Sequence, residues 1–194
     1  NKVVRVGDKY NYNDTGYTNW QGLFAQAEYN KDAISAVISV AGNNTSYKRE
    51  DYFKYTPDDP LRETDWVNFT AFSTKGGVNY RIDEKHNVFG NLGYFERAPF
   101  SDAVFLNNTN VTNEDAVNQK IFSAELGYGF RGDNFRADLN VYRTQWMDRT
   151  YTVSRTANNI QYTANILGID ALHQGVELEL QYRPVETLTL TGMA

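Results

Sequence analysis

The sequence predicts an all-β protein folded as an antiparallel, up-and-down meander. Two observations carry this prediction. Apolar and polar residues alternate with a period of two along the whole chain, and no helical period persists over three turns. Short polar turns also alternate with long polar segments, so each strand can pair with the next one in the sequence.

The alternating runs predict about ten strands. In order, they are 2–10, 18–29, 33–47, 66–82, 87–97, 118–130, 135–148, 151–166, 173–183 and 187–194. In the hairpin around 83–86, Val78 and Leu92 fall on one face of the sheet. Asn79 and Asn91 alternate with them and fall on the other face.

The same alternation predicts two chemically different faces over the whole sheet. The apolar face is expected to carry Ile34, Ala36, Ile38, Leu126, Tyr128, Leu139, Leu178 and Leu180. The polar face is expected to carry Ser35, Ser39, Glu125, Asp138, Glu177 and Glu179. If the apolar face meets a protein core, the fold is an ordinary sandwich. If it meets lipid, the polar face lines a lumen.

The links between the strands are of two kinds. Tight polar turns occur at 30–32, 83–86, 131–134 and 183–186. Long polar segments occur at 43–65, 98–117 and 149–160. This alternation places the tight turns at one end of the sheet and the long loops at the other. Tyrosines and phenylalanines gather near the tight turns, and both features are typical of transmembrane β-barrels.

Composition excludes several classes of function. The 194 residues contain no cysteine, which excludes disulfides and thiolate metal sites, and the net charge of −5 gives no basic stripe for nucleic acid. No apolar run reaches the roughly 20 residues of a spanning helix. The two histidines, His86 and His173, lack a neighbouring nucleophile or ligand motif. We therefore expect no catalytic residue, no cofactor and no metal site, and no enzymatic activity.

Four motifs resemble the barrel of TonB-dependent outer-membrane receptors. They are 22–29 (GLFAQAEY), 75–80 (KGGVNY), 91–100 (NLGYFERAPF) and 173–184 (HQGVELELQYRP). The segment 100–110 (FSDAVFLNNTN) is similar to members from Bacteroidetes. The resemblance covers essentially the whole chain, and the order and spacing of the motifs carry it.

The resemblance implies a large barrel of about 22 strands, an amino-terminal plug and a short TonB box. Residues 1–194 would then be a partial barrel domain of about ten strands, with the plug and the remaining barrel outside it. The implied function is uptake of a large, scarce nutrient, such as a siderophore, corrinoid or glycan, across the outer membrane of a Gram-negative bacterium. The implied partners are outer-membrane lipid, the TonB complex through the absent plug or TonB box, and a nutrient ligand at the extracellular loops.

Two alternatives remain open at this point. One is a complete small outer-membrane β-barrel, and the other is a soluble β-barrel or sandwich that binds carbohydrate or lipid.

Aromatic residues near the long loops are the candidates for ligand contact, because exposed rings can stack on sugars or planar chelates. The alternative is that these rings pack against one another and stiffen the loops. The candidates are Tyr52, Phe53, Tyr55, Trp66, Phe100, Phe105, Trp146 and Tyr151.

Overall fold

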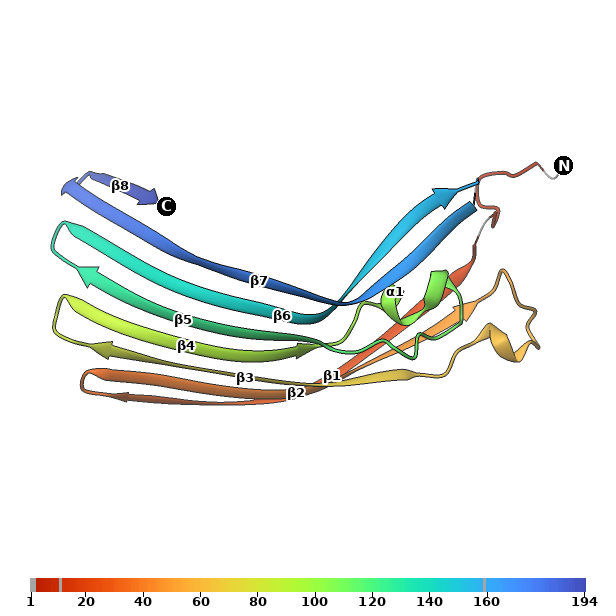
Figure 1. Cartoon of the computed structure of the whole chain (residues 1–194), viewed down its shortest axis with the longest axis horizontal. Coiled ribbons are helices and arrows are strands. Elements are labelled where there is room, and N and C mark those ends of the chain that lie inside the picture. Colours follow the sequence, from red (N-terminus) through yellow and green to blue (C-terminus); the bar gives the residue numbers. More distant parts are fainter. Residues whose placement is uncertain (1–2, 11, 159) are drawn as a thin grey trace.

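The computed structural model describes residues 3–10, 12–158 and 160–194. Its strands form a single eight-stranded sheet. All neighbouring strands are antiparallel and follow one another in sequence order, so the predicted meander is confirmed (Figure 1). The strands are β1 (Asp14–Lys31), β2 (Ile34–Asp51), β3 (Val67–Arg81), β4 (His86–Arg97), β5 (Gln119–Arg131), β6 (Phe135–Ala157), β7 (Ile160–Val185) and β8 (Leu188–Met193).

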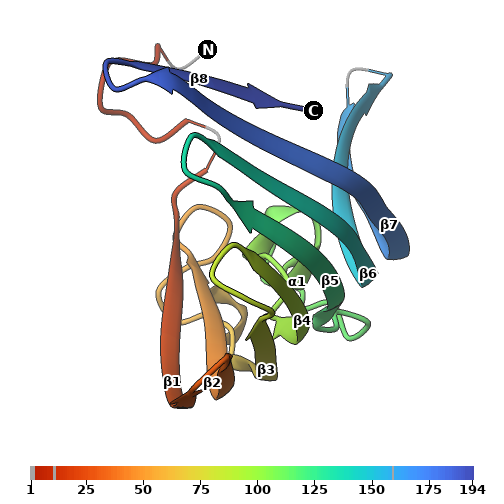
Figure 2. The ribbon, with the colours of Figure 1, turned by 90° about the vertical axis from the view of Figure 1, so that its left-hand side faces the viewer.

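The sheet curves into an open trough, as Figure 2 shows. Three short helical turns lie in the loops: η1 (Pro60–Arg62), α1 (Ser101–Val104) and η2 (Leu106–Asn108). The segment that carries α1 lies inside the concavity (Figure 2). Within the described parts of the chain, no helix is long and apolar enough to cross a membrane.

The two ends of the sheet differ as the link lengths predict. The tight turns that join β1 to β2, β3 to β4, β5 to β6 and β7 to β8 lie together at one end (Figure 1). The β2–β3 loop (52–66) and the β4–β5 loop (98–118) lie at the other end. The predicted separation of turns from long loops is confirmed.

The predicted strand 2–10 is wrong over the part of it that the structure describes. Residues 3–10 have no strand structure. The backbone N–H of Asp8 donates to the carbonyl oxygen of Arg5 (3.0 Å), and the N–H of Arg5 donates to the carboxylate of Asp8 (2.8 Å). Gly7 between them has a φ of 98°, which favours glycine. This local turn breaks the run that the alternating pattern suggested.

The predicted long loop at 149–160 is also wrong. The strand β6 continues to Ala157 and β7 begins at Ile160, so the pairing runs almost to the hairpin tip. The segment 150–156 (TYTVSRT) is rich in β-branched residues, which favour a strand even where the segment is polar. The sheet has eight strands instead of about ten, because residues 3–10 form no strand and three expected strands belong to these two long ones.

A bulge bends β6 and β7 between their two halves. The register shifts between Trp146 and Arg149 and again between Arg149 and Tyr151. Asp148 has a φ of 56° inside this stretch, and Gly168 on β7 has a φ of 67°. Bulges of this kind increase the local twist, and both strands turn sharply here in Figure 1.

The register confirms the predicted division into faces. On the apolar face, Tyr128 pairs with Leu139, which pairs with Leu178. On the polar face, Asp138 pairs with Glu179. No second layer covers the apolar face in the described residues, since Leu126 is 69% exposed. This uncovered surface is unlike the interior of a sandwich.

The small buried core lies on the polar face, next to the long loops. Phe69 of β3 packs against Val104 and Phe105 of the β4–β5 loop, with Tyr47 of β2 in contact with the same cluster. The rings of Tyr47 and Phe69 meet edge to face, with centroids 6.1 Å apart. This core holds the β4–β5 loop inside the trough.

Candidate ligand-binding surface at the long-loop end

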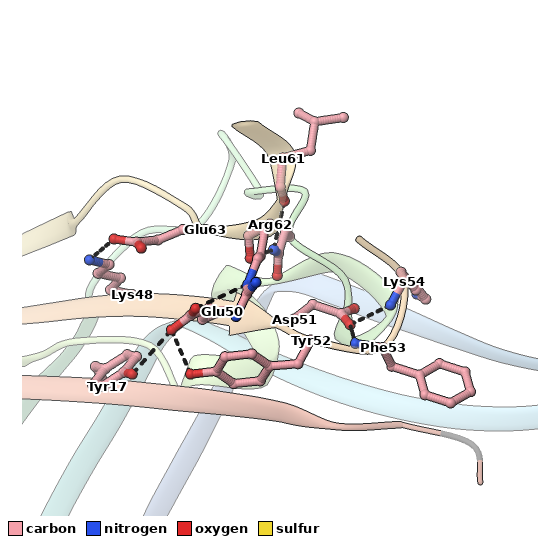
Figure 3. A network of polar contacts seen from close by, with 11 residues as sticks. Tyr17, Lys48, Glu50, Asp51, Tyr52, Phe53, Lys54, Leu61, Arg62 and Glu63 are labelled. Atoms are coloured by element: carbon pink, nitrogen blue, oxygen red, sulfur yellow. Dashed lines mark hydrogen bonds and ion pairs between the residues drawn. The ribbon is translucent and has the colours of Figure 1, made fainter. Parts of the chain in front are cut away.

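The β2–β3 loop is shaped by two aspartates, of which Asp51 is labelled in Figure 3. Asp51, at the end of β2, accepts hydrogen bonds from the backbone N–H groups of Phe53 (2.9 Å) and Lys54 (3.0 Å). Asp59 caps η1 by accepting from the N–H of Leu61 (2.9 Å). Such side-chain bonds to nearby backbone fix turns, so the course of the loop is set locally.

Glu50 is the centre of the polar network in Figure 3. Its carboxylate accepts from the hydroxyls of Tyr52 (2.6 Å) and Tyr17 (3.3 Å) and from Nε of Arg62 (3.2 Å). The hydrogen bond from Tyr52, together with the Arg62 charge, lowers the pKa of the Glu50 carboxyl, although partial desolvation opposes this. The same bond raises the pKa of Tyr52 to about 12. The network ties η1 to β1 and β2.

Tyr52 is a structural residue of this network. The guanidinium of Arg62 lies over its ring, 4.7 Å from the centroid, and its hydroxyl is held by Glu50. Its neighbours are freer: Phe53 is 45% exposed and Tyr55 is half-buried. Of these three candidates, Phe53 offers the most accessible ring.

Trp66 lies on the other side of the sheet from Phe53. The ammonium of Lys48 sits between the rings of Tyr17 (6.0 Å) and Trp66 (5.9 Å) and pairs with Glu63. Lys48 and Ile34 are an even number of residues apart on β2, so their side chains lie on the same face. This group therefore belongs to the apolar face, at its long-loop border. Aromatic and basic residues of this kind are typical of a membrane interface.

The β4–β5 loop presents one candidate ring and buries another. Phe100 is 54% exposed, with the guanidinium of Arg97 4.3 Å from its ring centroid. Phe105 is only 4% exposed, since it belongs to the core with Val104 and Phe69. Phe105 is therefore not accessible to a ligand in this conformation.

Asparagine side chains fasten this loop to its surroundings. Nδ2 of Asn110 donates to the carbonyl oxygens of Leu61 (2.8 Å) and Arg62 (2.7 Å) in the β2–β3 loop. Nδ2 of Asn118 donates to the carbonyl oxygen of Thr70 on β3 (2.7 Å). The two long loops therefore form one connected surface.

The remaining two candidates lie on β6. Trp146 has the parity of Asp138 and lies on the polar face, with the guanidinium of Arg149 5.0 Å from its ring centroid. Tyr151, beyond the bulge, is 62% exposed and pairs with Ile166. The eight candidates thus occupy both faces of the sheet and do not converge on one site.

A cavity of about 380 Å³ lies where the two loops meet the ends of β1 and β2. Of the candidate aromatics only Phe53 lines it. The lining residues are Tyr12, Asp14, Arg49, Asp51, Phe53, Lys54, Asn107 and Asn108. The expected long segment 43–65 includes the charged run 48–51, but β2 continues through this run to Asp51. Extending the strand parity beyond residue 47 would have placed Arg49 and Asp51 on the polar face.

The described residues contain no cluster of three or more histidine, aspartate or glutamate side chains that could hold a metal ion.

Residues 2–194 match the family described as TonB dependent receptor-like, beta-barrel. The chain belongs to this family. Its members are receptors and transporters, not enzymes, and lie in the outer membranes of Gram-negative bacteria. None of the curated proteins compared with the chain matches it.

Solved TonB-dependent receptors show the same fold. The copper transporter OprC has a TM-score of 0.70 at 17% identity, over 88% of this chain and 27% of that chain. The siderophore receptor PirA from Pseudomonas aeruginosa has a TM-score of 0.61 at 14% identity, over 93% of this chain and 43% of its own. BauA, the ferric preacinetobactin receptor from Acinetobacter baumannii, has a TM-score of 0.56 at 14% identity, over 93% of this chain and 25% of its own. The chain spans less than half of the length of each.

Proposed function

We propose that this chain forms part of the wall of an outer-membrane TonB-dependent receptor that takes up a large, scarce nutrient. The uncovered apolar face carries the proposal. Leu92, Leu126 and Val176 are each more than 60% exposed on that face, and Tyr and Phe rings lie at its turn end. A lipid bilayer is the surrounding in which such a band is stable.

The dimensions of the band agree with a bilayer. On β2 the apolar face runs from Ile34 to Gly42, after which Asn44 and Ser46 follow. This run of nine residues matches the roughly 9–11 residues with which a tilted strand crosses a bilayer. The longer strands β6 and β7 then extend beyond the membrane on the long-loop side.

We assign residues 1–194 to one section of the barrel domain, with the other strands and the plug elsewhere in the receptor. Two observations support this assignment: β1 and β8 each pair with one neighbour in the described sheet, and the chain covers only a fraction of each solved receptor. The TonB complex would act on the plug, outer-membrane lipid would cover the apolar face, and the nutrient would bind at the long loops.

The transported substrate is a siderophore, a corrinoid or a glycan on this proposal. Of the solved proteins, OprC is named as a copper transporter and PirA as a siderophore receptor. The segment 100–110 supports a member of the Bacteroidetes type.

Orientation in the membrane provides the test. The 194 residues contain no cysteine, so single cysteines can be placed at exposed Asp58 in the β2–β3 loop and at exposed Glu84 in the β3–β4 turn of the receptor. In intact cells, a membrane-impermeant maleimide should label Asp58→Cys, while Glu84→Cys should react only after the outer membrane is opened. Equal labelling of both positions in intact cells would contradict the proposal, as would recovery of the receptor in the soluble fraction.

A further inference from the structure

We propose that the cavity at the ends of β1 and β2 is a subsite for a neutral, polyhydroxylated group, such as a sugar ring of the nutrient. The inference rests on the proposed receptor function and adds a substrate class to it. The cavity has about 380 Å³ of space and opens between the β2–β3 and β4–β5 loops. Its position on the polar face directs it toward the lumen instead of the lipid.

A buried arginine with unfilled donors is the first observation. The side chain of Arg49 is 9% exposed, and its Nη2 pairs with Oδ2 of Asp14 at 3.0 Å. Its Nε is buried and has no hydrogen-bond partner. A guanidinium carries five N–H donors, and a buried donor left unpaired costs free energy. Nε of Arg49 therefore lacks an acceptor, which a ligand or ordered water can supply.

Carboxylates supply acceptors in the same cavity. Asp51 is 3% exposed, and its Oδ1 takes the backbone N–H groups of Phe53 and Lys54. Its Oδ2 has no protein donor among the described residues, and Asp14 is engaged by Arg49 through one oxygen. Hydroxyl groups both donate and accept, so they can satisfy the arginine and the carboxylates together.

The charge of the cavity favours a neutral ligand. Arg49 and Lys54 are balanced by Asp14 and Asp51, so the lining has no net charge. An anionic ligand would meet two carboxylates beside the cations, and like charges in a partly buried site repel. A neutral group with many hydroxyls avoids that cost.

Asparagines from the β4–β5 loop add donors of fixed direction. Oδ1 of Asn107 accepts from the backbone N–H of Thr163 on β7 (3.1 Å), which leaves its amide NH₂ as a donor. Asn107 and Asn108 both have a φ of 53°, a region that asparagine tolerates better than most residues. Both residues line the cavity.

Aromatic rings complete the site. Phe53 is 45% exposed and Tyr12 is 77% exposed, and both line the cavity. The face of an aromatic ring is electron-rich, so it attracts the polarised C–H groups on one side of a sugar ring. A few directed polar groups with aromatic walls are the usual composition of a small-ligand site.

The test measures ligand binding by the detergent-solubilised receptor with isothermal titration. The sugar probes are maltoheptaose, cellohexaose and inulin, and the comparison probes are citrate and a ferric catecholate chelate. Asn108→Gly keeps the left-handed backbone and removes only the amide, and it should weaken sugar binding about five-fold through lost hydrogen bonds. Phe53→Ala should weaken it about ten-fold through the lost ring contact.

Asn158→Gly is the matched control. Asn158 also has a positive φ of 52°, but it does not line the cavity. Sugar binding that weakens in Asn108→Gly and Phe53→Ala and not in Asn158→Gly would support the proposal. No saturable binding by any of the sugars would overturn it, as would sugar binding that both cavity variants retain.

Failure of this inference is separable from failure of the receptor function. Binding of citrate or the chelate without sugar binding overturns the sugar class and leaves a receptor. The cysteine-labelling result at Asp58 and Glu84 decides the membrane function independently of any ligand.

Discussion

The ring of Phe89 covers Gly127 on the polar face of the sheet. The two residues are paired across β4 and β5, and a Cβ atom at Gly127 would lie 2.2 Å from two atoms of the ring. The side-chain oxygen of Asn140 would lie 2.7 Å from the same position. Glycine is therefore required for the ring to lie across its neighbour, an arrangement that restores packing lost at a strand glycine.

Gly127→Ala should destabilise the receptor by about 1–3 kcal/mol, because the Phe89 ring must leave its position and disturb its neighbours. Thermal unfolding in detergent, followed by circular dichroism and by heat-modifiable gel migration, measures the change. Gly42→Ala is the control, since a Cβ atom there meets nothing within 4 Å. Equal destabilisation by the two variants would contradict this account.

The strand meander was predictable because its signal is local. The period-two alternation from Phe122 to Val141 fixes which side chain lies on which face, and the register follows once a tight turn joins the strands. The predicted strand at 2–10 was wrong because it rested on alternation alone. The predicted loop at 149–160 was wrong because it rested on polarity alone. Gly7 breaks the first run, and β-branched threonines keep the second one paired despite its polarity.

The candidate site was less predictable because its residues are brought together by loops. The sequence shows that Phe53 and Phe105 are aromatic, but not that one is exposed and the other is in a core. Asn107 and Arg49 meet at one cavity only because the β4–β5 loop docks inside the trough. That docking depends on long-range contacts with Phe69, which no local pattern records.

Asn110→Ala should loosen the contact between the two long loops. Its Nδ2 donates to two carbonyl oxygens of η1, of Leu61 and Arg62, and loss of these bonds should lower the local opening free energy by about 1–3 kcal/mol. Hydrogen–deuterium exchange of peptides covering 60–66 measures it. Asn110→Asp should be at least as damaging, since a carboxylate oxygen would face the carbonyls.

Asn158→Ala is the control for the two Asn110 variants, because Asn158 is exposed and lies at the β6–β7 hairpin tip. Exchange in 60–66 should be unchanged in this variant. Protection that survives both Asn110 variants would show that the β2–β3 loop is held by its own aspartates and the Glu50 network alone.

The Glu50–Tyr52 pair should give the β2–β3 loop a stability plateau bounded on both sides by pH. The folded-state pKa of Glu50 is lowered, so its contribution is present above the unfolded value of about 4.3 and is lost as pH falls through the lowered pKa. The pKa of Tyr52 is raised to about 12, so its contribution is present below about pH 10 and is lost as pH rises toward 12. Proteolysis of the loop by an enzyme active over a wide pH range measures both limits.

Tyr52→Phe separates the two limits. The variant keeps the ring under Arg62 and removes the hydroxyl, so the loss of protection near pH 12 should disappear and cleavage should be faster across the plateau. Glu50→Gln should remove the acid limit. If the loss of protection at high pH persists in Tyr52→Phe, a group other than Tyr52 causes it.

Phe105→Ala should release the β4–β5 loop from the trough without unfolding the sheet. Phe105 is 4% exposed and packs with Val104 and Phe69, and truncating a buried phenylalanine costs about 3–5 kcal/mol. The strands that flank the loop are paired with their neighbours over many residues, so the lost free energy should weaken loop docking and leave the sheet folded. The expected result is rapid proteolysis within 98–118, with heat-modifiable gel migration unchanged. Phe100→Ala, which removes a ring that is 54% exposed, should change the free energy of loop docking by less than about 0.5 kcal/mol.

Because Asn107 and Asn108 lie on the same loop, release of the loop in Phe105→Ala should also abolish the cavity next to Arg49. Ligand binding that persists after release would place the nutrient elsewhere on the long-loop surface.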